Sequence, residues 1–337
     1  MKHTLIVAGC AALCVSSASV LADTVLYGKA HVALVNETVK ADGDDKGTGE
    51  LILESRASRF GVKGKAELSE GLEAIYKWET EVKWNHATDG AGDTQLKARN
   101  TYVGLKGGFG KVVMGINDTP MKQSEGKVDV FSDREDMAKI QDAFVDTQER
   151  ENNIVSYYSP KFNNMQFAVA TMPGKSAEEI GYAWSTSLVY GDKKLKKTPF
   201  YAAIAYDDKV DGDTTDALRV VGSAKMGGVT LGALAEQVTK EDGDATTDDE
   251  QMRYLVSGKY KLDKKNTVLL QHVSAEEVNG QTSSSAFKGG NELNSTSIGV
   301  DHKLGKQTKV YGMYTVRKDE TVNTEKTKFA IGLEHKF

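Results

Sequence analysis

Two cations in one extended stretch are the first residues in this chain whose types and spacing point to chemistry. In the stretch 58–64, Arg59 and Lys63 fall on one face of a strand. The apolar Phe60 and Val62 fall on the other face. If such a strand crosses a bilayer, an arginine facing lipid at mid-depth costs roughly 2–4 kcal/mol. Both cations are therefore predicted to face water on the inner side of a sheet.

Acidic side chains are concentrated in one polar segment, 118–150, which holds nine acids and five bases. Four of these acids are candidate site residues: Asp129, Asp133, Glu135 and Asp136. Carboxylates a few ångströms from cations set up a strong local field. A simpler interpretation, in which each acid is only a solvated loop charge, stays open.

Other kinds of site find little support in the sequence. The five histidines after residue 22 show no HExxH or other metal-ligand spacing, and no glycine-rich phosphate loop precedes a helix. Asp-Gly stretches near 42–45, 211–213 and 242–244 could bind calcium, but they lack the full ligand spacing of a calcium loop. We therefore expect no metal, no cofactor and no enzymatic activity.

The clearest element around these residues is the segment 72–84. Leu, Ala, Tyr, Trp, Thr and Val occupy one face, whereas glutamates and lysines dominate the other. A helix would spread these charges around its circumference, but a strand separates them. At ~3.3 Å per residue the segment reaches ~43 Å, which suits a tilted membrane strand. Trp78 and Trp84 are candidates for an aromatic girdle.

Sixteen strands of this kind are predicted, joined by seven short and eight longer connections that strictly alternate. They are expected at 24–36, 50–66, 72–84, 95–106, 110–117, 151–160, 164–172, 177–190, 197–208, 214–226, 228–240, 249–262, 265–276, 291–304, 307–318 and 324–337. This alternation is the layout of an up-and-down barrel with short turns on the periplasmic side. The Greek-key connections of a soluble sandwich would break that order.

The predicted fold is therefore all-β, a 16-stranded antiparallel transmembrane β-barrel formed by residues 23–337. Sixteen strands leave an aqueous lumen, whereas eight would be filled by side chains. The last strand, 324–337, should close against 24–36, because an open hydrogen-bonding edge cannot face lipid. The mean hydropathy of −0.44 argues against a helical membrane protein, and low hydropathy is compatible with a barrel, where only alternate residues meet lipid.

The amino terminus, 1–22, has the pattern of a cleaved secretory signal peptide. Lys2 and His3 precede an apolar run, and Ala22 ends a small-residue cleavage site before Asp23. A buried first helix and a lipoprotein box at 7–10 are the alternatives. Cleavage would remove both cysteines and Lys2, which leaves 42 basic and 48 acidic residues and a net charge of −6.

Several stretches together resemble the general porins of Gram-negative outer membranes, of the neisserial and β-proteobacterial type. Each motif is weak by itself, but their order and spacing carry the resemblance through essentially the whole mature chain. The stretches are LYGKA at 26–30, SRFGVKG at 58–64, RNTYVGLK at 99–106, FGKVVMG at 109–115, NIVSYYSP at 153–160 and the terminal Phe337.

The resemblance implies a homotrimer of sixteen-stranded barrels, each narrowed by an inward-folded third external loop, here 118–150. It also implies a ladder of basic side chains facing acids on that loop. Carried over by motif, the ladder falls on Lys29, Arg59, Arg99 and Arg150, with Lys63 beside Arg59. The loop lacks the Pro-Glu-Phe-Gly signature of many family members, which leaves open which acid faces the ladder. A carboxy-terminal phenylalanine, here Phe337, is read in that family by the barrel-assembly machinery.

These observations predict an outer-membrane porin for the passive diffusion of ions and small hydrophilic solutes. Two alternatives use the same fold: a channel selective for an organic acid or a sugar, and a barrel that serves as an adhesin or enzyme scaffold. The expected partners are other copies of the chain, outer-membrane lipid, lipopolysaccharide and the barrel-assembly machinery, with no nucleic acid. Family analogy favours anions weakly, while the acidic loop and net charge favour cations.

Overall fold

The computed structural model describes most of the chain after residue 22. The described ranges are 23–41, 47–84, 96–134, 144–174, 182–212, 215–240, 249–276, 292–320 and 323–337. The predicted signal peptide at 1–22 lies outside them, as do Glu135 and Asp136. Each Asp-Gly stretch also falls wholly or partly outside them.

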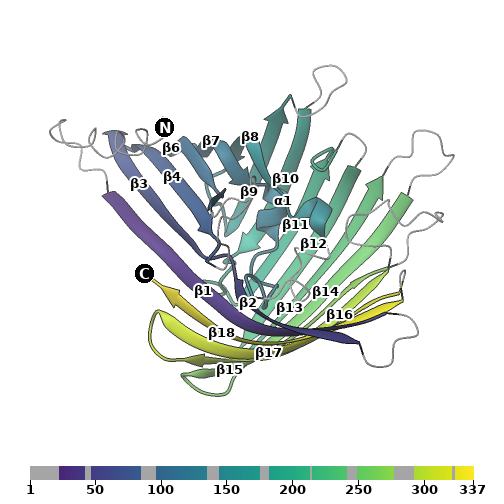
Figure 1. The fold of residues 1–337 in the computed structure, drawn as a ribbon. Coiled ribbons are helices and arrows are strands. Elements are labelled where there is room, and N and C mark those ends of the chain that lie inside the picture. Colours follow the sequence, from purple (N-terminus) through teal and green to yellow (C-terminus); the bar gives the residue numbers. More distant parts are fainter. Residues whose placement is uncertain are drawn as a thin grey trace, which may run out of the picture.

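Eighteen strand segments, each antiparallel to its neighbours, form one sheet that closes on itself (Figure 1). They are β1 Asp23–Lys40, β2 Thr48–Ser55, β3 Arg59–Ser69, β4 Leu72–Val82, β5 Leu96–Ala98, β6 Thr101–Gly107, β7 Gly110–Asp118, β8 Arg150–Tyr158, β9 Met165–Pro173, β10 Tyr182–Gly191, β11 Phe200–Asp208, β12 Thr215–Met226, β13 Val229–Lys240, β14 Asp249–Lys261, β15 Asn266–Ala275, β16 Leu293–Lys303, β17 Thr308–Asp319 and β18 Thr324–Lys336. A short helix, α1 Pro120–Ser124, and a 3-10 turn, η2 Val145–Thr147, lie between β7 and β8.

The closed wall nevertheless has sixteen strands, as predicted. Both β2 and β3 pair with β1, and both β5 and β6 pair with β4, so each pair continues one strand of the wall. The seam also closes as expected, because β1 and β18 pair in register from Lys29 with Lys336 to Lys40 with Glu325. The chain is thus a closed sixteen-stranded antiparallel barrel.

The first interruption, at 56–58, divides the strand that was predicted as one piece from 50 to 66. Ala57 has a φ of 48°, in the left-handed region that breaks a ladder. Ser58 replaces the missing bonds, since its hydroxyl donates to the His31 carbonyl at 2.8 Å and accepts from the His31 amide at 2.9 Å. The pairing with β1 therefore continues past the break.

The second interruption, at 99–100, divides the strand predicted at 95–106. The Arg99 amide still donates to the Glu79 carbonyl at 3.0 Å. The side chains of Arg99 and Asn100 engage carboxylates, which are described below. A period-two pattern cannot reveal such a break, because the polar alternation continues through it.

The two faces of the wall differ in character. Along β18, Phe329, Ile331 and Leu333 are exposed on the outer face, whereas the intervening Ala330 is fully buried. The other strands repeat this pattern, with large apolar side chains exposed on one face. Such a band of outward apolar residues is what a lipid-facing barrel surface requires.

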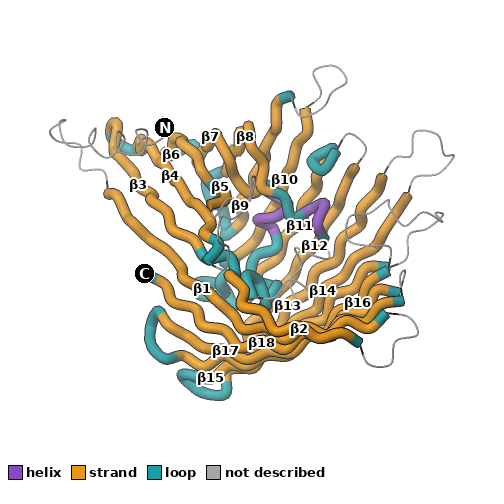
Figure 2. The backbone as a smooth tube through the Cα atoms, in the orientation of Figure 1, coloured by secondary structure: helices purple, strands orange, loops and turns teal. Residues whose placement is uncertain are grey.

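Three of the buried apolar clusters lie where the 119–149 segment meets the wall. Met121 packs with Ala205, Ala217 and Val238 of β11 to β13. Phe131 belongs to a cluster with residues of β1, β15, β17 and β18. Val128 and Phe144 belong to a third cluster with β10 to β16. Figure 2 shows α1 in purple and the adjoining teal connection on the concave side of the strands.

Helix α1 was not predicted, although the chain carries its start signal. The Thr119 hydroxyl accepts from the Lys122 amide at 3.1 Å, and Pro120 occupies the first turn. Threonine before proline is a common helix start. Of the helices that the structure describes, none is both long and apolar enough to cross a membrane.

Candidate functional site

A tight turn at 131–134 presents two opposite charges to two parts of the wall. The turn is closed by the Arg134 amide, which donates to the Phe131 carbonyl at 2.9 Å. Asp133 has a φ of 64°, a conformation that aspartate tolerates better than most residues. Arg134 reaches Asp301 on β16, with 2.7 Å between its Nη2 and the carboxylate Oδ2.

Asp133 bridges two of the predicted ladder cations. Its Oδ2 lies 2.9 Å from the Lys29 ammonium of β1 and 2.8 Å from the Arg59 guanidinium of β3. Although burial acts to raise the pKa of the Asp133 carboxyl, the charges of Arg59 and Lys29 hold it well below its usual range. The turn thus brings one carboxylate of the 119–149 segment against two neighbouring strands.

Arg99 binds carboxylates of the wall itself. Its Nε lies 2.9 Å from Glu79 Oε1, and its Nη1 lies 2.7 Å from Glu81 Oε2. Both acids are on β4, and Glu79 also accepts from the Tyr27 hydroxyl at 2.8 Å. The carboxylates facing this part of the ladder therefore come from the neighbouring strand.

Arg150, at the start of β8, contacts a different acid. Its Nη2 lies 3.0 Å from Asp118 Oδ1, and its Nε donates to the Asn100 side-chain oxygen at 2.6 Å. Asn100 in turn donates to the other oxygen of Asp118 at 2.9 Å. Asp118 ends β7, so this cluster fixes both ends of the 119–149 segment to each other.

The remaining candidates occupy separate positions. The Lys63 ammonium lies 5.0 Å from the centre of the Tyr27 ring, at an exposed place on β3. The Asp129 carboxylate accepts from the Phe131 amide at 2.9 Å and from the Gln271 side chain of β15 at 3.1 Å. The structure thus brings Lys29, Arg59 and Asp133 together, while Asp129 bonds to β15.

A second charged cluster, on β12 to β14, was missed by the sequence reasoning. Arg219 donates to Glu236 at 2.7 Å, to the Thr147 hydroxyl at 2.8 Å and to the Met121 carbonyl at 3.1 Å. Arg253 lies 3.0 Å from Asp146. All of these charged side chains are fully buried. The cluster ties the 119–149 segment to the wall at a second site.

The sequence signal for these residues was weak. Glu79 and Glu81 lie on the charged face of the segment 72–84, so the period of two places them on the inner face. Nothing in that pattern says which cation each one meets, because the pairing depends on register and on the path of the 119–149 segment. The partners of Arg99 and Arg219 could therefore not be predicted from the sequence.

The terminal Phe337 lies at the barrel seam. Its carbonyl accepts from the Gly28 amide at 2.9 Å, and its amide donates to the Gly28 carbonyl at 3.1 Å. The ring covers Gly28 so closely that a Cβ at that glycine would lie 2.2 Å from the ring tip. Phe337 thus extends the pairing of the last strand with the first.

Cation–carboxylate pairs on the inner face can orient and sort charged solutes, but they offer no obvious reaction chemistry. A nucleophile would need a base and an orienting group close to it. Across the described ranges, no group of three or more histidine, cysteine, aspartate or glutamate side chains is placed to hold a metal ion. The geometry is that of charged groups fixed along an inner wall.

Comparisons with known proteins bear on this geometry. A family model described as "Gram-negative porin" matches residues 9–321. The major outer membrane protein P.IB of Neisseria gonorrhoeae is 29% identical over 196 residues, which cover 56% of this chain and 53% of that protein. The chain thus aligns with about half the length of that relative. The P.IB protein of Neisseria sicca is 25% identical over 373 residues, with full coverage of both chains.

A solved structure shares the fold. The anion-selective porin from Comamonas acidovorans superposes with a TM-score of 0.74 at 20% identity, covering 94% of this chain and 100% of that one. At that identity the likeness concerns the fold, a closed barrel of the same architecture.

Proposed function

Because the chain belongs to the Gram-negative porin family, whose members lie in the outer membrane, we propose that it forms a water-filled channel there. Ions and small hydrophilic solutes would cross it by passive diffusion. A closed barrel of sixteen strands is wide enough for an aqueous lumen. Its function is transport and not catalysis.

The observation that carries this proposal is the position of Asp133 between Lys29 and Arg59. We infer that the 119–149 segment folds into the lumen and narrows it. The inference is supported by the bonds from Asp133 to β1 and β3, from Arg134 to β16 and from Asp146 to β14, which are distant parts of one closed wall. The narrow section is then bordered by these charged pairs.

The channel works without a conformational cycle. Fixed cations and carboxylates set a field across the narrow section, and solutes are sorted by size and charge as they diffuse. Lys29, Arg59, Arg99 and Arg150 supply the basic side of this field, with Lys63 nearby. Asp133 supplies the acid of the 119–149 segment, and Glu79, Glu81 and Asp118 add acids from the wall. Asp129, Glu135 and Asp136 stay candidates on that segment.

Anion preference is the selectivity that we propose. Asp133 is shared between two cations, Lys29 and Arg59, so this group of three charges keeps an excess of positive charge. The solved porin with the same fold is described as anion-selective. A channel selective for one organic acid or sugar is the second candidate, and a scaffold for adhesion or catalysis is the third.

We also propose that the chain works as a homotrimer. A trimeric form is described for an outer membrane protein of Vibrio cholerae with this fold. The exposed apolar side chains of the outer face would contact lipid, lipopolysaccharide or a second copy. Export would use the signal peptide at 1–22, and Phe337 would be read by the barrel-assembly machinery.

Single-channel recording in planar bilayers tests the channel and its narrow section together. The variant Arg59→Glu with Arg99→Glu should shift the reversal potential in a salt gradient toward cation selectivity, because it reverses two charges of the basic side. A matched variant, Lys264→Glu with Lys265→Glu, makes the same charge change in an exposed turn and should leave the reversal potential near the wild-type value.

The outcomes separate the three candidates. Large, stepwise, weakly selective openings without a blocking solute support the diffusion channel. Block by micromolar amounts of one organic acid or sugar would favour the selective channel. Absence of any conductance from correctly folded protein would exclude both kinds of channel. An unchanged reversal potential in the Arg59 and Arg99 variant would refute the assignment of these arginines to the basic side of the narrow section.

A further inference from the structure

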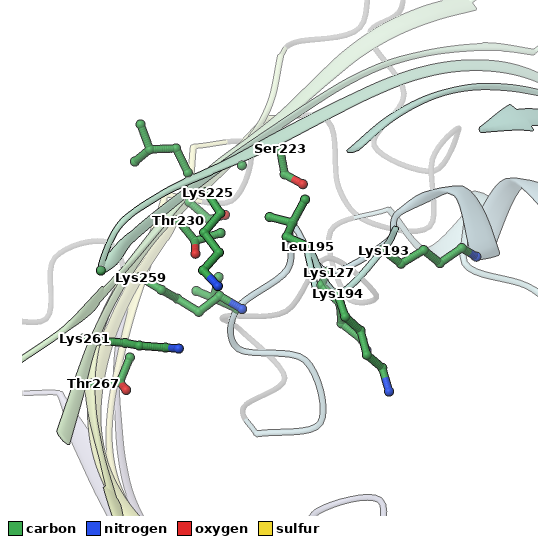
Figure 3. A pocket seen from close by; sticks show the side chains of 15 residues that line it. Lys127, Lys193, Lys194, Leu195, Ser223, Lys225, Thr230, Lys259, Lys261 and Thr267 are labelled. Atoms are coloured by element: carbon green, nitrogen blue, oxygen red, sulfur yellow. The ribbon is translucent and has the colours of Figure 1, made fainter. Parts of the chain in front are cut away.

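A lysine-lined space lies in the barrel apart from the Asp133 cluster. It is open to solvent and lies between β12 to β15, the β10–β11 turn and the 119–149 segment. Six lysines line it: Lys127, Lys193, Lys194, Lys225, Lys259 and Lys261. Figure 3 shows that Lys225, Lys259 and Lys261 extend from the wall into the same space.

The strand pattern fixes these three lysines on the inner face. On β12, Lys225 follows the buried Val221 by four residues and the buried Arg219 by six, so all three lie on the same face of the strand. On β14, Lys259 and Lys261 share a face with Ser257, whose hydroxyl bonds to a carbonyl of the 119–149 segment. Residues of equal parity point to the same side of a strand. The ammonium groups therefore reach the lumen and not lipid.

The lining carries no counter-charge. None of the fifteen described residues that border the space is an aspartate or a glutamate. Within the described part of the chain, Lys225, Lys259 and Lys261 have no carboxylate within 4.0 Å, in contrast to Lys29 and Arg59. Several lysines so close together repel one another unless an anion joins them.

The β10–β11 turn adds a lysine with an altered proton affinity. Burial lowers the pKa of the Lys193 ammonium to about 8; Glu125 opposes this shift and the charge of Lys127 adds to it. The Lys193 ammonium donates to the Gln123 carbonyl at 2.5 Å. This contact holds the turn against the 119–149 segment, so that the segment forms one side of the space.

We propose that this space is a binding site for small phosphate-bearing anions, with Lys225, Lys259 and Lys261 as its principal cations. Ammonium groups bind phosphate as adaptable point charges, and several of them can surround one phosphate group. Hydroxyls of Thr230 and Thr267 border the same space and can donate to phosphate oxygens.

The site deepens the proposed channel function and rests on it. Lys225 and Lys261 lie at strand ends next to the short turns, whereas the Asp133 cluster contacts the middle of the wall. An anion that has entered the lumen would thus pause at a second place. Binding there raises the local concentration of phosphate-bearing solutes and slows their exit.

The experiment measures block of the chloride current by pyrophosphate and by inorganic phosphate in planar bilayers. In the wild-type channel both anions should reduce the current, pyrophosphate at the lower concentration. In Lys225→Gln with Lys259→Gln, the half-blocking concentration of pyrophosphate should rise at least about tenfold, because two charge-assisted contacts are lost. The control Lys264→Gln with Lys265→Gln removes equal charge from an exposed turn, and pyrophosphate should block it at the wild-type concentration.

The outcomes keep the site and the channel distinct. A channel that conducts chloride but is blocked equally in wild type, variant and control would overturn the site and leave the channel standing. Lack of block in wild type would also overturn it. Lys261→Gln alone, a milder change, should raise the half-blocking concentration in the same direction, and phosphorus NMR of the protein in detergent should show broadening of the phosphate signal that the double variant loses.

Discussion

Asp133 is the carboxylate through which the 119–149 segment meets β1 and β3. It lies within 3 Å of both a lysine and an arginine, so its charge cancels part of theirs. Its backbone has a φ of 64°, a conformation that asparagine also tolerates. The position can therefore lose its charge with little change of shape.

Asp133→Asn should make the channel more anion-selective. The substitution leaves Lys29 and Arg59 without the shared carboxylate, so the net positive charge of the narrow section rises by one. The reversal potential in a chloride gradient should move further toward the chloride equilibrium value. Glu70→Gln, in an exposed turn, is the matched control and should leave it in place. Equal reversal potentials for wild type and Asp133→Asn would place this carboxylate outside the conducting path.

At the scale of the residue, the sequence predicts which face of the wall each cation occupies, but it does not predict which acid the cation contacts. The alternation of Arg59 and Lys63 with apolar residues predicts which way each cation points, because strand side chains alternate. It could not tell that Glu79 and Glu81 would meet Arg99, or that Asp129 would bond to β15. Those contacts depend on the three-dimensional path of the 119–149 segment.

At the scale of the element, the 119–149 segment is held by buried charge as well as by apolar packing. Glu125 follows α1, and burial together with the nearby Asp129 raises its pKa to about 7. Lys122, Lys127 and Arg219 oppose this rise. A carboxyl group whose pKa is higher in the folded than in the unfolded state contributes its full stabilisation at a pH below the unfolded-state pKa. This contribution is lost as the pH rises through the folded-state pKa.

The stability of the folded protein should therefore fall between about pH 4.5 and pH 7 through ionisation of Glu125. Thermal unfolding followed by circular dichroism in detergent measures this fall. Glu125→Gln should flatten the pH dependence, since the amide does not ionise in that range. Glu250→Gln, at an exposed position on β14, should keep the wild-type slope. If the unfolding temperature of Glu125→Gln falls with pH as steeply as that of wild type, another group causes the pH dependence.

Strand positions were predictable because each has a period of two, whereas the interruptions were not. Ala57 has a positive φ, which interrupts the hydrogen-bonded ladder. Alanine is not a residue type that signals such a conformation. Helix α1 could have been found from Thr119 and Pro120, but the surrounding charges suggested a plain loop. The 119–149 segment is thus the part of the fold where local patterns carry least information.

At the scale of the whole molecule, closure of the wall depends on the seam between β1 and β18. The number of strands and their order followed from the alternation of short and long connections. The contact of the Phe337 ring with Gly28 at this seam did not, because the period of two does not show which residues meet across it. Only a residue without a side chain leaves room for that ring.

Gly28→Ala should weaken the seam. The added Cβ would lie 2.2 Å from the Phe337 ring, so the ring must move away. The temperature at which the folded barrel is lost on SDS gels should fall. Gly222→Ala places a methyl group in open space and should preserve the wild-type temperature. If both variants unfold together with wild type, the ring contributes nothing to closure.

The pairing of Lys29 with Lys336 also sets an order of events in time. β1 is the first strand of the wall in the sequence, and it cannot complete its hydrogen bonds until β18 has formed beside it. An edge strand that waits is exposed to pairing with other chains, and contacts so distant in sequence form slowly. β1 therefore stays an open edge until β18 has folded against it, and the backbone bonds between Phe337 and Gly28 complete the closure.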